Sequence, residues 1–527
     1  MLLIYYSYIL IYYTTTYNMP DATNDTMNDV VIIGGGISGL YILDELTSKY
    51  SNLNIKLLER DPHVGGRIHT KYYKDGSVKF ETGPWRFHHS HKNLIALLRK
   101  YNLSYFQNSS SDASAKNSEG YTCKYGDKQT QNGNGNGNGN GNANFKQSTQ
   151  TSGLSIRDTS LLNNTCSSKK YESISKIPLV MDSTSKPYDV KNYYKGDYFV
   201  VEKGFSQLVA QMNAKLQQFI FCNSFVIDVI RKYNHYIITY RRRNGNQYTT
   251  YSVKTRFLFL CIPPNFCKEW TIVSKYLLPL IHSVDTIPLH HVYGFSNKLN
   301  TLFDNKFYIK TDTELGQVIS GDFDNNWFQA SYSSGEDAKF LYRLKQTNPS
   351  LFVSTIKKKL TLLNIKIPIT KFESFFWEHA IHFWKPAFQF DLDKSMRKSV
   401  YPHPVNLPNL FYAGEAFSDL QGWIEGSLST SIIALSTFDA VRNNRFVFKP
   451  VKLKTNEYVI LDNRYLDVKK WKVVHPGSTA AIKNHLTEDI SDLFRQINHT
   501  HYSWAVVNSI QTYWLYHNKT GVFVISN

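Results

Sequence analysis

Three glycines near the start of the chain have the spacing that a phosphate-binding turn requires. They are Gly34, Gly36 and Gly39 in the run VVIIGGGISGLYILDEL, where an apolar stretch precedes the turn and an amphipathic stretch follows it. Gly34 allows the tight turn, Gly36 lets backbone amides approach a pyrophosphate, and Gly39 lets a helix lie close to a strand. Ser38 belongs to the same helix start, whose amino end attracts phosphate charge. The pattern predicts a strand, turn and helix that bind a dinucleotide.

A carboxylate follows where a dinucleotide-binding fold needs one. The segment NIKLLER predicts a second strand that ends near Glu59 and Arg60. Glu59 is placed to accept hydrogen bonds from ribose hydroxyls. A glycine turn alone is weak evidence for a cofactor, but strand, helix and acid in register argue against an unrelated turn.

The next residues resemble the flavin amine oxidase superfamily. RDPHVGGRIHT carries the GGR motif that follows the ribose acid in that superfamily, and the resemblance implies FAD rather than NAD. It places Gly66 where the backbone approaches the cofactor, and Arg67 against cofactor phosphate or the ring edge. The segment FETGPWRFHHSHK is similar to L-amino acid oxidases, which adds Gly83, Pro84 and Trp85 to the expected cofactor residues.

A second part of the resemblance lies far along the chain. YFVVEKGFSQLVAQM, FVIDVI around Val226 and FLFLCIPP resemble further FAD-domain segments, and NLFYAGEAFSDLQGWIEGSLSTS resembles the closing FAD motif. The resemblance places Gly414 and Glu415 at the ribityl phosphate, and Trp423 and Ile424 at a helix start that faces the flavin. Trp423 then walls the substrate pocket, or is a buried aromatic at a helix start. Residues 388–411 contain no cysteine, so we expect non-covalent FAD.

Arg86 and Tyr332 are the candidate substrate residues. In L-amino acid oxidases an arginine at the position of Arg86 pairs with the substrate carboxylate, which suits a planar two-donor fork; flavin contact or a structural ion pair is the alternative. Tyr332, in ASYSSGEDAKFL, resembles a tyrosine that helps to hold that carboxylate, or is a core residue. The substrate expected is a small-molecule amine, with an L-amino acid favoured.

Two further residues are candidates for the catalytic pocket. The superfamily commonly has a lysine near the reactive flavin nitrogen, and His290 in IPLHHVYGF is the expected equivalent, able to orient water or act as a base. Trp384 is an aromatic pocket wall or a core residue. The cluster at 88–91 contains three histidines, but consecutive side chains diverge, which favours a pocket rim over a metal site.

The chain's last segment resembles cytochrome b5. YLDVKKW is followed by HPGS, where that family has HPGG, and NHT stands where it has GHS. The resemblance implies haem b with His475 and His499 as axial ligands, and two imidazoles leave no open position for dioxygen. Ser478 and Asn498 replace glycines of the family, and a domain without haem is the alternative.

These residues need several elements to position them. The fold class expected is α/β: a discontinuous Rossmann-like FAD domain of the GR2 type (29–85, 198–265 and 400–445), interleaved with an α+β substrate domain (86–107 and 266–399). A small α+β haem domain (455–527) follows a linker (446–454). The Ser-, Asn- and Gly-rich stretch at 108–192 is expected to be a flexible insertion, and 1–28 a leader whose start is overextended.

Composition narrows the function classes. The chain has 527 residues, 15% aromatic, with a formal net charge of +18; its basic residues are scattered, which argues against nucleic-acid binding. Five irregularly spaced cysteines favour a reducing compartment. We expect no stable membrane span and a cytoplasmic location, with membrane association through the apolar amino terminus as the alternative.

The predicted reaction is amine oxidation by hydride transfer to FAD, followed by imine hydrolysis. Dioxygen, giving peroxide, or a one-electron acceptor reached through the haem takes the electrons. Alternatives within the fold are a polyamine or porphyrinogen oxidase or a desaturase. An alternative outside it is a flavoprotein that has lost turnover.

Overall fold

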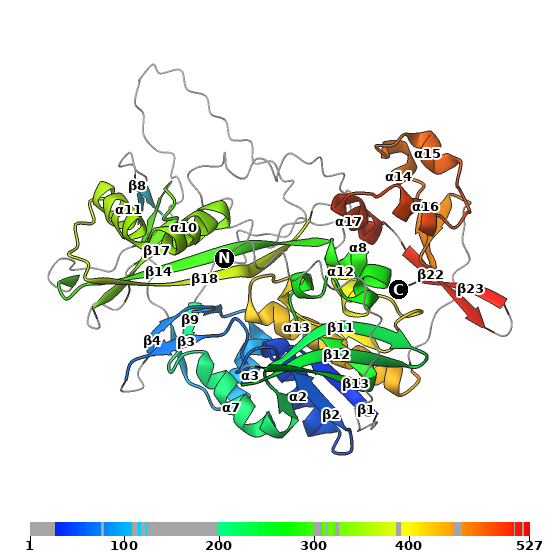
Figure 1. The fold of residues 1–527 in the computed structure, drawn as a ribbon, viewed down its shortest axis with the longest axis horizontal. Helices are drawn as coiled ribbons and strands as arrows, with labels where there is room; N and C mark the ends of the chain where they lie inside the picture. Colours follow the sequence, from blue (N-terminus) through cyan, green and yellow to red (C-terminus); the bar gives the residue numbers. More distant parts are fainter. Residues whose placement is uncertain are drawn as a thin grey trace, which may run out of the picture.

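The computed structural model of the chain describes residues 27–107, 114–116, 122–124, 198–385, 392–445 and 456–526, apart from short gaps at 75–77, 246, 300–307, 312, 320, 322–325, 511 and 519–520. The first 26 residues and most of the predicted insertion and linker lie outside the described residues. Figure 1 shows two large sheets joined through the middle of the chain, with a smaller unit formed by the C-terminal residues.

The first sheet contains the predicted dinucleotide-binding strand. Its order is β10-β2-β1-β13-β12-β11, and β19 pairs with β13. Strands β1, β2, β10, β13 and β19 run parallel where they pair, whereas β11, β12 and β13 form an antiparallel extension. The bounds are β1 Asn28–Ile33, β2 Ile55–Leu58, β10 Ile220–Phe221, β11 Ser224–Lys232, β12 His235–Asn244, β13 Gln247–Leu260 and β19 Leu410–Tyr412.

Helices from three distant parts of the sequence pack on this sheet. They bury one apolar core with β1, and the burial of its aliphatic and aromatic side chains stabilises the arrangement. The sheet is completed late in the sequence, because β19 and α13 are contributed by residues after position 400. The helices are α2 Ile37–Lys49, α3 Lys92–Lys100, α7 Ser206–Leu216 and α13 Ile424–Arg442.

The second sheet is antiparallel, in the order β15-β16-β17-β14-β18. Two helices, α10 Gly335–Thr347 and α11 Pro349–Leu362, cover one of its faces in Figure 1, and the first sheet's domain lies on the side of the other face. Successive side chains on its long strands therefore alternate between the two sides. The strands are β14 Val284–Phe295, β15 Tyr308–Lys310, β16 Gln317–Ile319, β17 Trp327–Ser334 and β18 Lys371–Trp384.

Short strands and helices connect the two large sheets. The small sheets are β3-β4, β5-β9-β6 and β7-β8. Their strands are β3 Thr70–Tyr72, β4 Val78–Glu81, β5 Phe87–His88, β6 Tyr105–Gln107, β7 Ser114–Lys116, β8 Thr122–Lys124 and β9 Tyr198–Val201. The remaining helical segments are η2 Gln217–Phe219, η3 Pro264–Phe266, η4 Val273–Leu277, α8 Leu278–Ile281, α12 Leu392–Val400 and η5 Glu415–Phe417.

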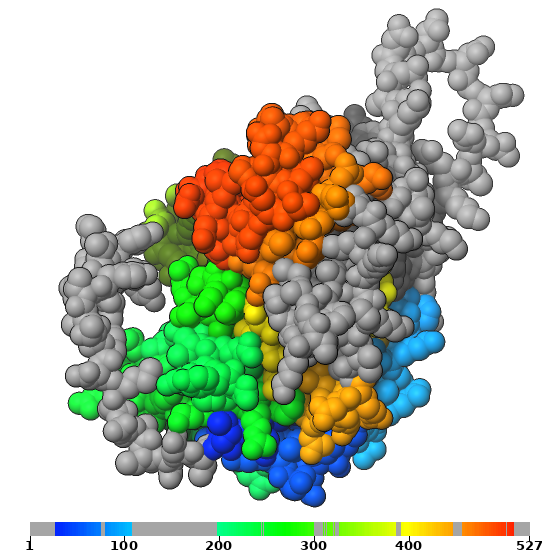
Figure 2. All heavy atoms as spheres, turned by 90° about the vertical axis from the view of Figure 1, so that its right-hand side faces the viewer, coloured from blue at the N-terminus to red at the C-terminus, as the bar shows by residue number. Residues whose placement is uncertain are grey.

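The C-terminal residues form a unit with its own sheet and core. The sheet order is β20-β21-β22-β23, and the core centres on Leu461, Leu466 and Trp504. Figure 2 shows this unit, in orange and red, seated on the green part of the chain. Its elements are β20 Tyr458–Leu461, β21 Arg464–Asp467, α14 Trp471–Val474, α15 Thr479–Lys483, α16 Ser491–Gln496, α17 His501–Ser509, β22 Thr512–Asn518 and β23 Gly521–Ser526.

None of the helices in the described ranges is long and apolar enough to cross a membrane.

Candidate functional site

The glycine turn between β1 and α2 packs against the GGR segment. Gly65 N donates to Gly35 O at 2.8 Å, and a Cβ on Gly39 would lie 2.0 Å from Gly34 O. Only glycine at 39 therefore allows α2 to approach β1 this closely. A Cβ on Gly36, in contrast, would meet no atom within 4 Å. Open space thus lies beside the start of α2, whose N-cap residue Gly36 has no side chain to bond the first amides of the helix.

Glu59 stands at the end of β2 and is buried. Its Oε2 accepts from Gly35 N at 2.6 Å and its Oε1 from Asp61 N at 2.8 Å, while burial raises its pKa. Each carboxylate oxygen has a second lone pair, so the group keeps capacity to accept from a ligand. Arg60 turns outward, where its guanidinium lies 4.8 Å from the centre of the Phe266 ring.

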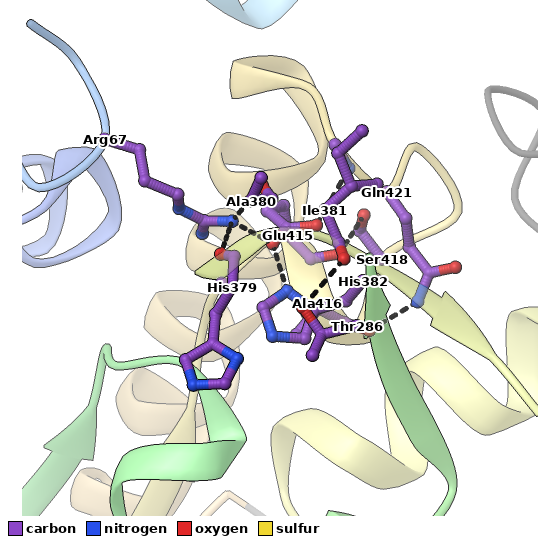
Figure 3. Close-up of polar contacts among 12 residues, drawn as sticks. Arg67, Thr286, His379, Ala380, Ile381, His382, Glu415, Ala416, Ser418 and Gln421 are labelled. Carbon is purple, nitrogen blue, oxygen red and sulfur yellow. Dashed lines mark hydrogen bonds and ion pairs between the residues drawn. The ribbon is translucent and has the colours of Figure 1, made fainter. Parts of the chain in front are cut away.

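Arg67 and Glu415 form an ion pair across the centre of the molecule. Arg67 Nη1 lies 2.6 Å from Glu415 Oε1 and also donates to Ala380 O at 2.8 Å. His382 Nδ1 lies 2.5 Å from the same Glu415 oxygen, and Gly422 N donates to Oε2 at 2.8 Å. Figure 3 shows the contacts of Arg67 and His382 converging on Glu415. Both carboxylate oxygens therefore have protein partners, which a buried charge requires.

The electrostatics of this junction favour an ionised Glu415. Burial raises the pKa of the carboxyl, but the charge of Arg67 and the contact with His382 outweigh burial and hold the pKa below its ordinary value of 4.5. Ionised Glu415 thereby ties the GGR segment and the end of β18 to the segment before α13.

A second open space lies next to this junction. A Cβ on Gly414 would meet no atom within 4 Å. Ser38 Oγ lies 3.4 Å from Ser427 O, which links the starts of α2 and α13. The expected cofactor residue Ile424 is buried in the core instead of facing open space. Two uncapped helix starts and two unfilled glycine positions therefore occur in the region where the sequence predicts FAD.

Arg86 lies among aromatic rings. Its guanidinium carbon is 4.3 Å from the centre of the Tyr198 ring and 4.9 Å from that of Trp85. Tyr198 in turn stacks on Trp423 at 6.4 Å and 23°. No ion pair of Arg86 occurs within the described part of the chain. The structure thus brings together Arg86 and Trp423, two predicted site residues, through a tyrosine that the sequence did not indicate.

Pairing of β5 with β9 places Tyr198, because His88 is its partner in the register. The neighbouring His91 contacts Trp423 at 4.9 Å between ring centres. Burial lowers the pKa of His91 to about 3, so its ring is neutral near pH 7. No group of three or more potential metal ligands occurs among the described residues. Arg86, Tyr198 and Trp423 together form what we call the aromatic wall. The histidine cluster borders this wall.

The two adjacent histidines of β14 face opposite sides of the second sheet. His290 lies against Tyr342, Phe352 and Phe376, on the side of α10 and α11. His291 lies on the other side, 4.7 Å from the Tyr332 ring. The structure does not bring His290 to the candidate site, which corrects its expected position next to the flavin, because strand alternation turns it into the helical layer.

His291 faces the first sheet's domain through a short chain of contacts. Its Nδ1 lies 3.3 Å from the Tyr293 hydroxyl, which donates to Glu81 O at 2.6 Å. Glu81 directly precedes the Thr82–Gly83 segment, and a Cβ on Gly83 would lie 1.9 Å from Arg67 O. Tyr332 shares the face of His291 on the second sheet.

The remaining predicted site residues serve packing in this structure. Trp384 is 1% exposed, and its indole donates to Ser418 O at 3.0 Å, so it supports the segment behind Glu415. Val226 is also buried in the core of the first sheet. Pro84 is half-buried next to Trp85.

The C-terminal unit places His475 within range of the charge of His499. His499 Nδ1 lies 3.0 Å from Phe494 O, and its ring stacks on Phe494 at 4.0 Å and 6°. A carbonyl only accepts, so Nδ1 carries the proton and Nε2 keeps a free lone pair, as in metal-binding histidines. Burial and the nearby charge of His499 lower the pKa of His475, although its bond with Ser478 O opposes them.

Other features of this unit suit a large apolar ligand. Val473, Val474 and Ile497 flank the two histidines and are 68%, 48% and 58% exposed. Ser478 and Asn498 have φ of 86° and 52°, so both residues adopt the left-handed conformation that favours glycine, the residue that the resemblance to cytochrome b5 leads us to expect there. The donor set and the exposed apolar flanks therefore fit a haem bound by two imidazoles.

Three residues of the site were missed from the sequence. His382 and His291 lie on long strands, where alternation alone does not indicate which face meets a ligand. Tyr198 follows the long insertion, and its pairing with β5 has no local signal in the sequence. The closeness of Tyr198 to Arg86 therefore required the structure.

Comparisons with known proteins agree with this fold. A family model described as an NAD(P)-binding Rossmann-like domain matches residues 32–101. Coproporphyrinogen III oxidase of Bacillus subtilis (strain 168) is 38% identical over 86 residues, 16% of this chain and 18% of that protein. An uncharacterised protein of Acanthamoeba polyphaga mimivirus is 30% identical over 69 residues, 13% and 14% of the two chains. The matches thus span less than a fifth of either relative.

Similar solved structures cover much more of the chain. A structure described as that of a protoporphyrinogen oxidase from Exiguobacterium sp. 255-15 has a TM-score of 0.55 at 12% identity, and covers 80% of this chain and 100% of that one. Putrescine oxidase bound to putrescine has a TM-score of 0.51 at 15% identity, with 79% and 99% covered. The chain therefore contains an NAD(P)-binding Rossmann-like domain, within a mixed α/β fold that it shares with these two oxidases.

Proposed function

We propose that this chain is an FAD-dependent oxidoreductase that oxidises a carboxylate-bearing amine, with an L-amino acid as the favoured substrate. The Arg67–Glu415 junction carries this proposal, because it joins the GGR segment, the end of β18 and the segment before α13 next to two unfilled glycine positions. The fold shared with two solved oxidases supports the same reaction class.

The described residues fit a non-covalent FAD. Gly34, Gly36 and the start of α2 would hold the pyrophosphate, Glu59 the ribose hydroxyls, and Gly414 the region of the ribityl chain. The partners of Glu415 are already within the protein, so we assign it the role of holding Arg67 rather than direct contact. FAD, when bound, supplies a hydride acceptor.

Substrate recognition is assigned to the aromatic wall of Arg86, Tyr198 and Trp423. The Arg86 fork suits a carboxylate, and stacking on Tyr198 and Trp85 limits its motion without neutralising its charge. A polyamine carries two or more positive charges and would be repelled by this arginine. The wall therefore favours amino acids over putrescine-like substrates.

The chain's own task in the reaction is mainly to position and desolvate the substrate. The amine must be neutral, with its alpha hydrogen towards the flavin. His91, with its pKa lowered to about 3, adds no positive charge to the wall near pH 7. His291 is the histidine of β14 that faces this side. We propose that His291, in place of His290, orients water or acts as the base.

The C-terminal unit is proposed to be a cytochrome b5-like haem domain with His475 and His499 as ligands. The Phe494 carbonyl fixes the His499 tautomer, and the exposed apolar side chains nearby would cover the haem faces. Haem, when bound, supplies one-electron exchange. A soluble one-electron acceptor or dioxygen then receives the electrons from the substrate.

A porphyrinogen oxidase is the second candidate. Coproporphyrinogen III oxidase is the 38% identical relative over 86 residues, and its name identifies a substrate class that also carries carboxylates, which Arg86 would suit. The aromatic wall gives no comparable support to polyamine oxidation, because Arg86 would repel a positively charged polyamine.

An anaerobic substrate panel tests the proposal. Flavin absorbance is followed after addition of L-amino acids, D-amino acids, putrescine and coproporphyrinogen, and the proposal predicts bleaching by L-amino acids. Arg86→Lys should raise the apparent KM for the amino acid about tenfold, because lysine cannot form the two-donor fork. Arg243→Lys, at an exposed position outside the wall, is the control. Bleaching by putrescine alone, or an unchanged KM in Arg86→Lys, would contradict the assignment.

A further inference from the structure

Helix α17 of the C-terminal unit lies directly against α8 of the larger part of the chain. Figure 1 places α17 next to α8 and α12, and Figure 2 shows the red and orange unit seated on the green segment. Helix α17 begins at His501, two residues after the proposed haem ligand His499. Contacts of α17 therefore fix where that ligand lies relative to the first sheet's domain.

The amino end of α17 meets a histidine of the larger part. The rings of His501 and His282 stack with centres 4.1 Å apart and planes 25° apart. His282 is 7% exposed and follows α8 directly. Burial, with the nearby charge of His501 as the next cause, lowers the pKa of His282 to about 4. Both rings can therefore stay in contact near pH 7 without repulsion between two imidazolium charges.

The middle and the carboxyl end of α17 are also held. Leu278 of α8 packs against the core of the first sheet and against the core of the C-terminal unit. Lys398 Nζ, from α12, donates to Asn508 O near the end of α17 at 2.9 Å, and burial lowers the pKa of this lysine to about 7. Contacts from one end of α17 to the other indicate one fixed orientation and not a loosely tethered unit.

The residues behind His282 lead to the candidate flavin site. Ser283 O accepts from Lys385 N at 2.9 Å, and Lys385 follows Trp384 at the end of β18. The Trp384 indole donates to Ser418 O at 3.0 Å, and Ser418 Oγ donates to Glu415 O at 2.8 Å. Glu415 pairs with Arg67. A continuous series of contacts therefore runs from His501 to the centre of the proposed flavin site.

We propose that the α17 junction is a built-in docking interface through which electrons pass between the two proposed cofactor sites. The inference rests on the proposed function. Oxidation of one amine to an imine releases two electrons and two protons; the protons pass to solvent. A haem held by His475 and His499 would accept one electron at a time, so two successive crossings and two equivalents of a soluble one-electron acceptor would complete a turnover. The contacts of Leu278, His282 and Lys398 set the distance that each electron crosses between the two proposed cofactor sites.

Hydrogen exchange and anaerobic stopped-flow absorbance on the full chain test this proposal together. Leu278→Asp should disrupt the shared apolar contact, and His501→Ala removes the ring stack from an exposed position and spares the core. Both should accelerate amide exchange in α17 about tenfold. Both should also slow substrate-driven haem reduction about tenfold or more, since a tethered but undocked unit acts only by effective concentration.

Matched controls separate docking from folding and from cofactor loss. Leu362→Asp places the same charge at an exposed leucine of α11, and His501→Phe keeps a ring for the stack; both should behave as the unmodified chain. Flavin and haem content, and the rate of flavin reduction by substrate, should be the same in all variants. These readouts show whether a slow haem reduction comes from the junction.

Three results would each overturn the inference. Fast exchange of α17 in the unmodified chain would contradict docking while leaving the proposed function intact. Native rates of haem reduction in a variant that has lost protection of α17 would contradict the transfer role. A full chain that binds no haem would overturn the haem assignment and with it the transfer role, although protection of α17 would still report docking.

Discussion

Glu415 is 3% exposed, and both of its carboxylate oxygens are bonded within the protein. Its ionised form is the partner of Arg67, so the charge on the carboxylate connects the segments that surround the proposed FAD site. A buried ion pair is costly to break from one side, because the remaining charge loses its compensation.

Replacing Glu415 by Gln should lower the free energy of unfolding by about 3 kcal/mol and weaken FAD binding, because Arg67 is left unpaired. Denaturant unfolding and flavin titration measure the two effects. Glu336→Gln removes an exposed carboxylate that pairs with Lys339, and should change stability by no more than about 0.5 kcal/mol. Equal effects of the two variants would contradict the role assigned to the junction.

The contribution of Glu415 to the free energy of unfolding depends on pH with a definite sign. Its pKa in the folded protein lies below the ordinary 4.5, so the unfolded chain takes up the proton first as pH falls. The stabilisation is therefore complete above pH 4.5 and is lost as pH falls towards the folded-state pKa.

His290 should affect acid stability and not the chemistry. Burial lowers its pKa from 6.5 to about 3, so the free energy of unfolding falls as pH decreases from 6.5 towards 3. Protonation of His290 should lower the free energy of unfolding by about 2 kcal/mol at pH 5, and His290→Leu should abolish this loss. Unfolding at pH 7 and pH 5 measures it, with His63→Leu as the exposed control; slower flavin reduction in His290→Leu at pH 7 would instead restore a catalytic role.

The sequence predicted the residue types of the site better than their contacts. Arg67 and Glu415 were both expected next to FAD, but their pairing could not be read from segments so far apart in the chain. His290 was expected on the flavin side because the IPLHHVYGF motif does not specify strand register. A shift of one residue turns a side chain to the other face, and His291 lies on the expected face.

At the level of elements, two glycines where β1 meets α2, Gly36 in the turn and Gly39 in the helix, have different tasks. Gly39 allows close packing of helix and strand, since a Cβ there would lie 2.0 Å from Gly34 O. Gly36 borders open space and has an extended backbone with φ −71° and ψ −179°, which alanine also adopts. Gly39 therefore serves the packing of the fold, and Gly36 leaves space for a ligand.

Gly39→Ala should destabilise the chain by about 2 kcal/mol or more, because the added methyl group clashes with the backbone. Gly36→Ala should leave unfolding within about 0.5 kcal/mol of the unmodified chain but weaken FAD binding about tenfold, because the methyl group enters the ligand space. Thermal unfolding and flavin titration of both variants check the pair. FAD binding unchanged in Gly36→Ala would show that the open space is not the cofactor site.

Elements defined by local patterns were predictable, whereas those defined by distant pairing were not. The strand, turn and helix at the amino end are confirmed by the family model for residues 32–101. The position of Tyr198 depends on β9 pairing with β5 across a stretch with no readable pattern. The haem domain stays a prediction, supported by the geometry of His499 and by the left-handed backbone at Ser478 and Asn498.

At the level of the whole molecule, the Arg67–Glu415 ion pair and the end of β18 connect the two large sheets, and α17 docks the C-terminal unit on α8. The α/β class with a Rossmann-like domain is confirmed by the family match and by the shared fold. The docking of α17 on α8 could not be predicted, because a linker sequence does not specify an orientation. The full chain therefore joins the proposed flavin and haem sites in one arrangement.

The most direct test of the central claim is the visible absorption spectrum of the purified full chain, recorded without oxygen before and after addition of a mixture of L-amino acids. We predict flavin bands that bleach and reduced-haem bands that rise after the addition. A protein whose flavin and haem bands do not change would contradict amino acid oxidation, and a protein without flavin bands would contradict the assignment as a flavin oxidoreductase.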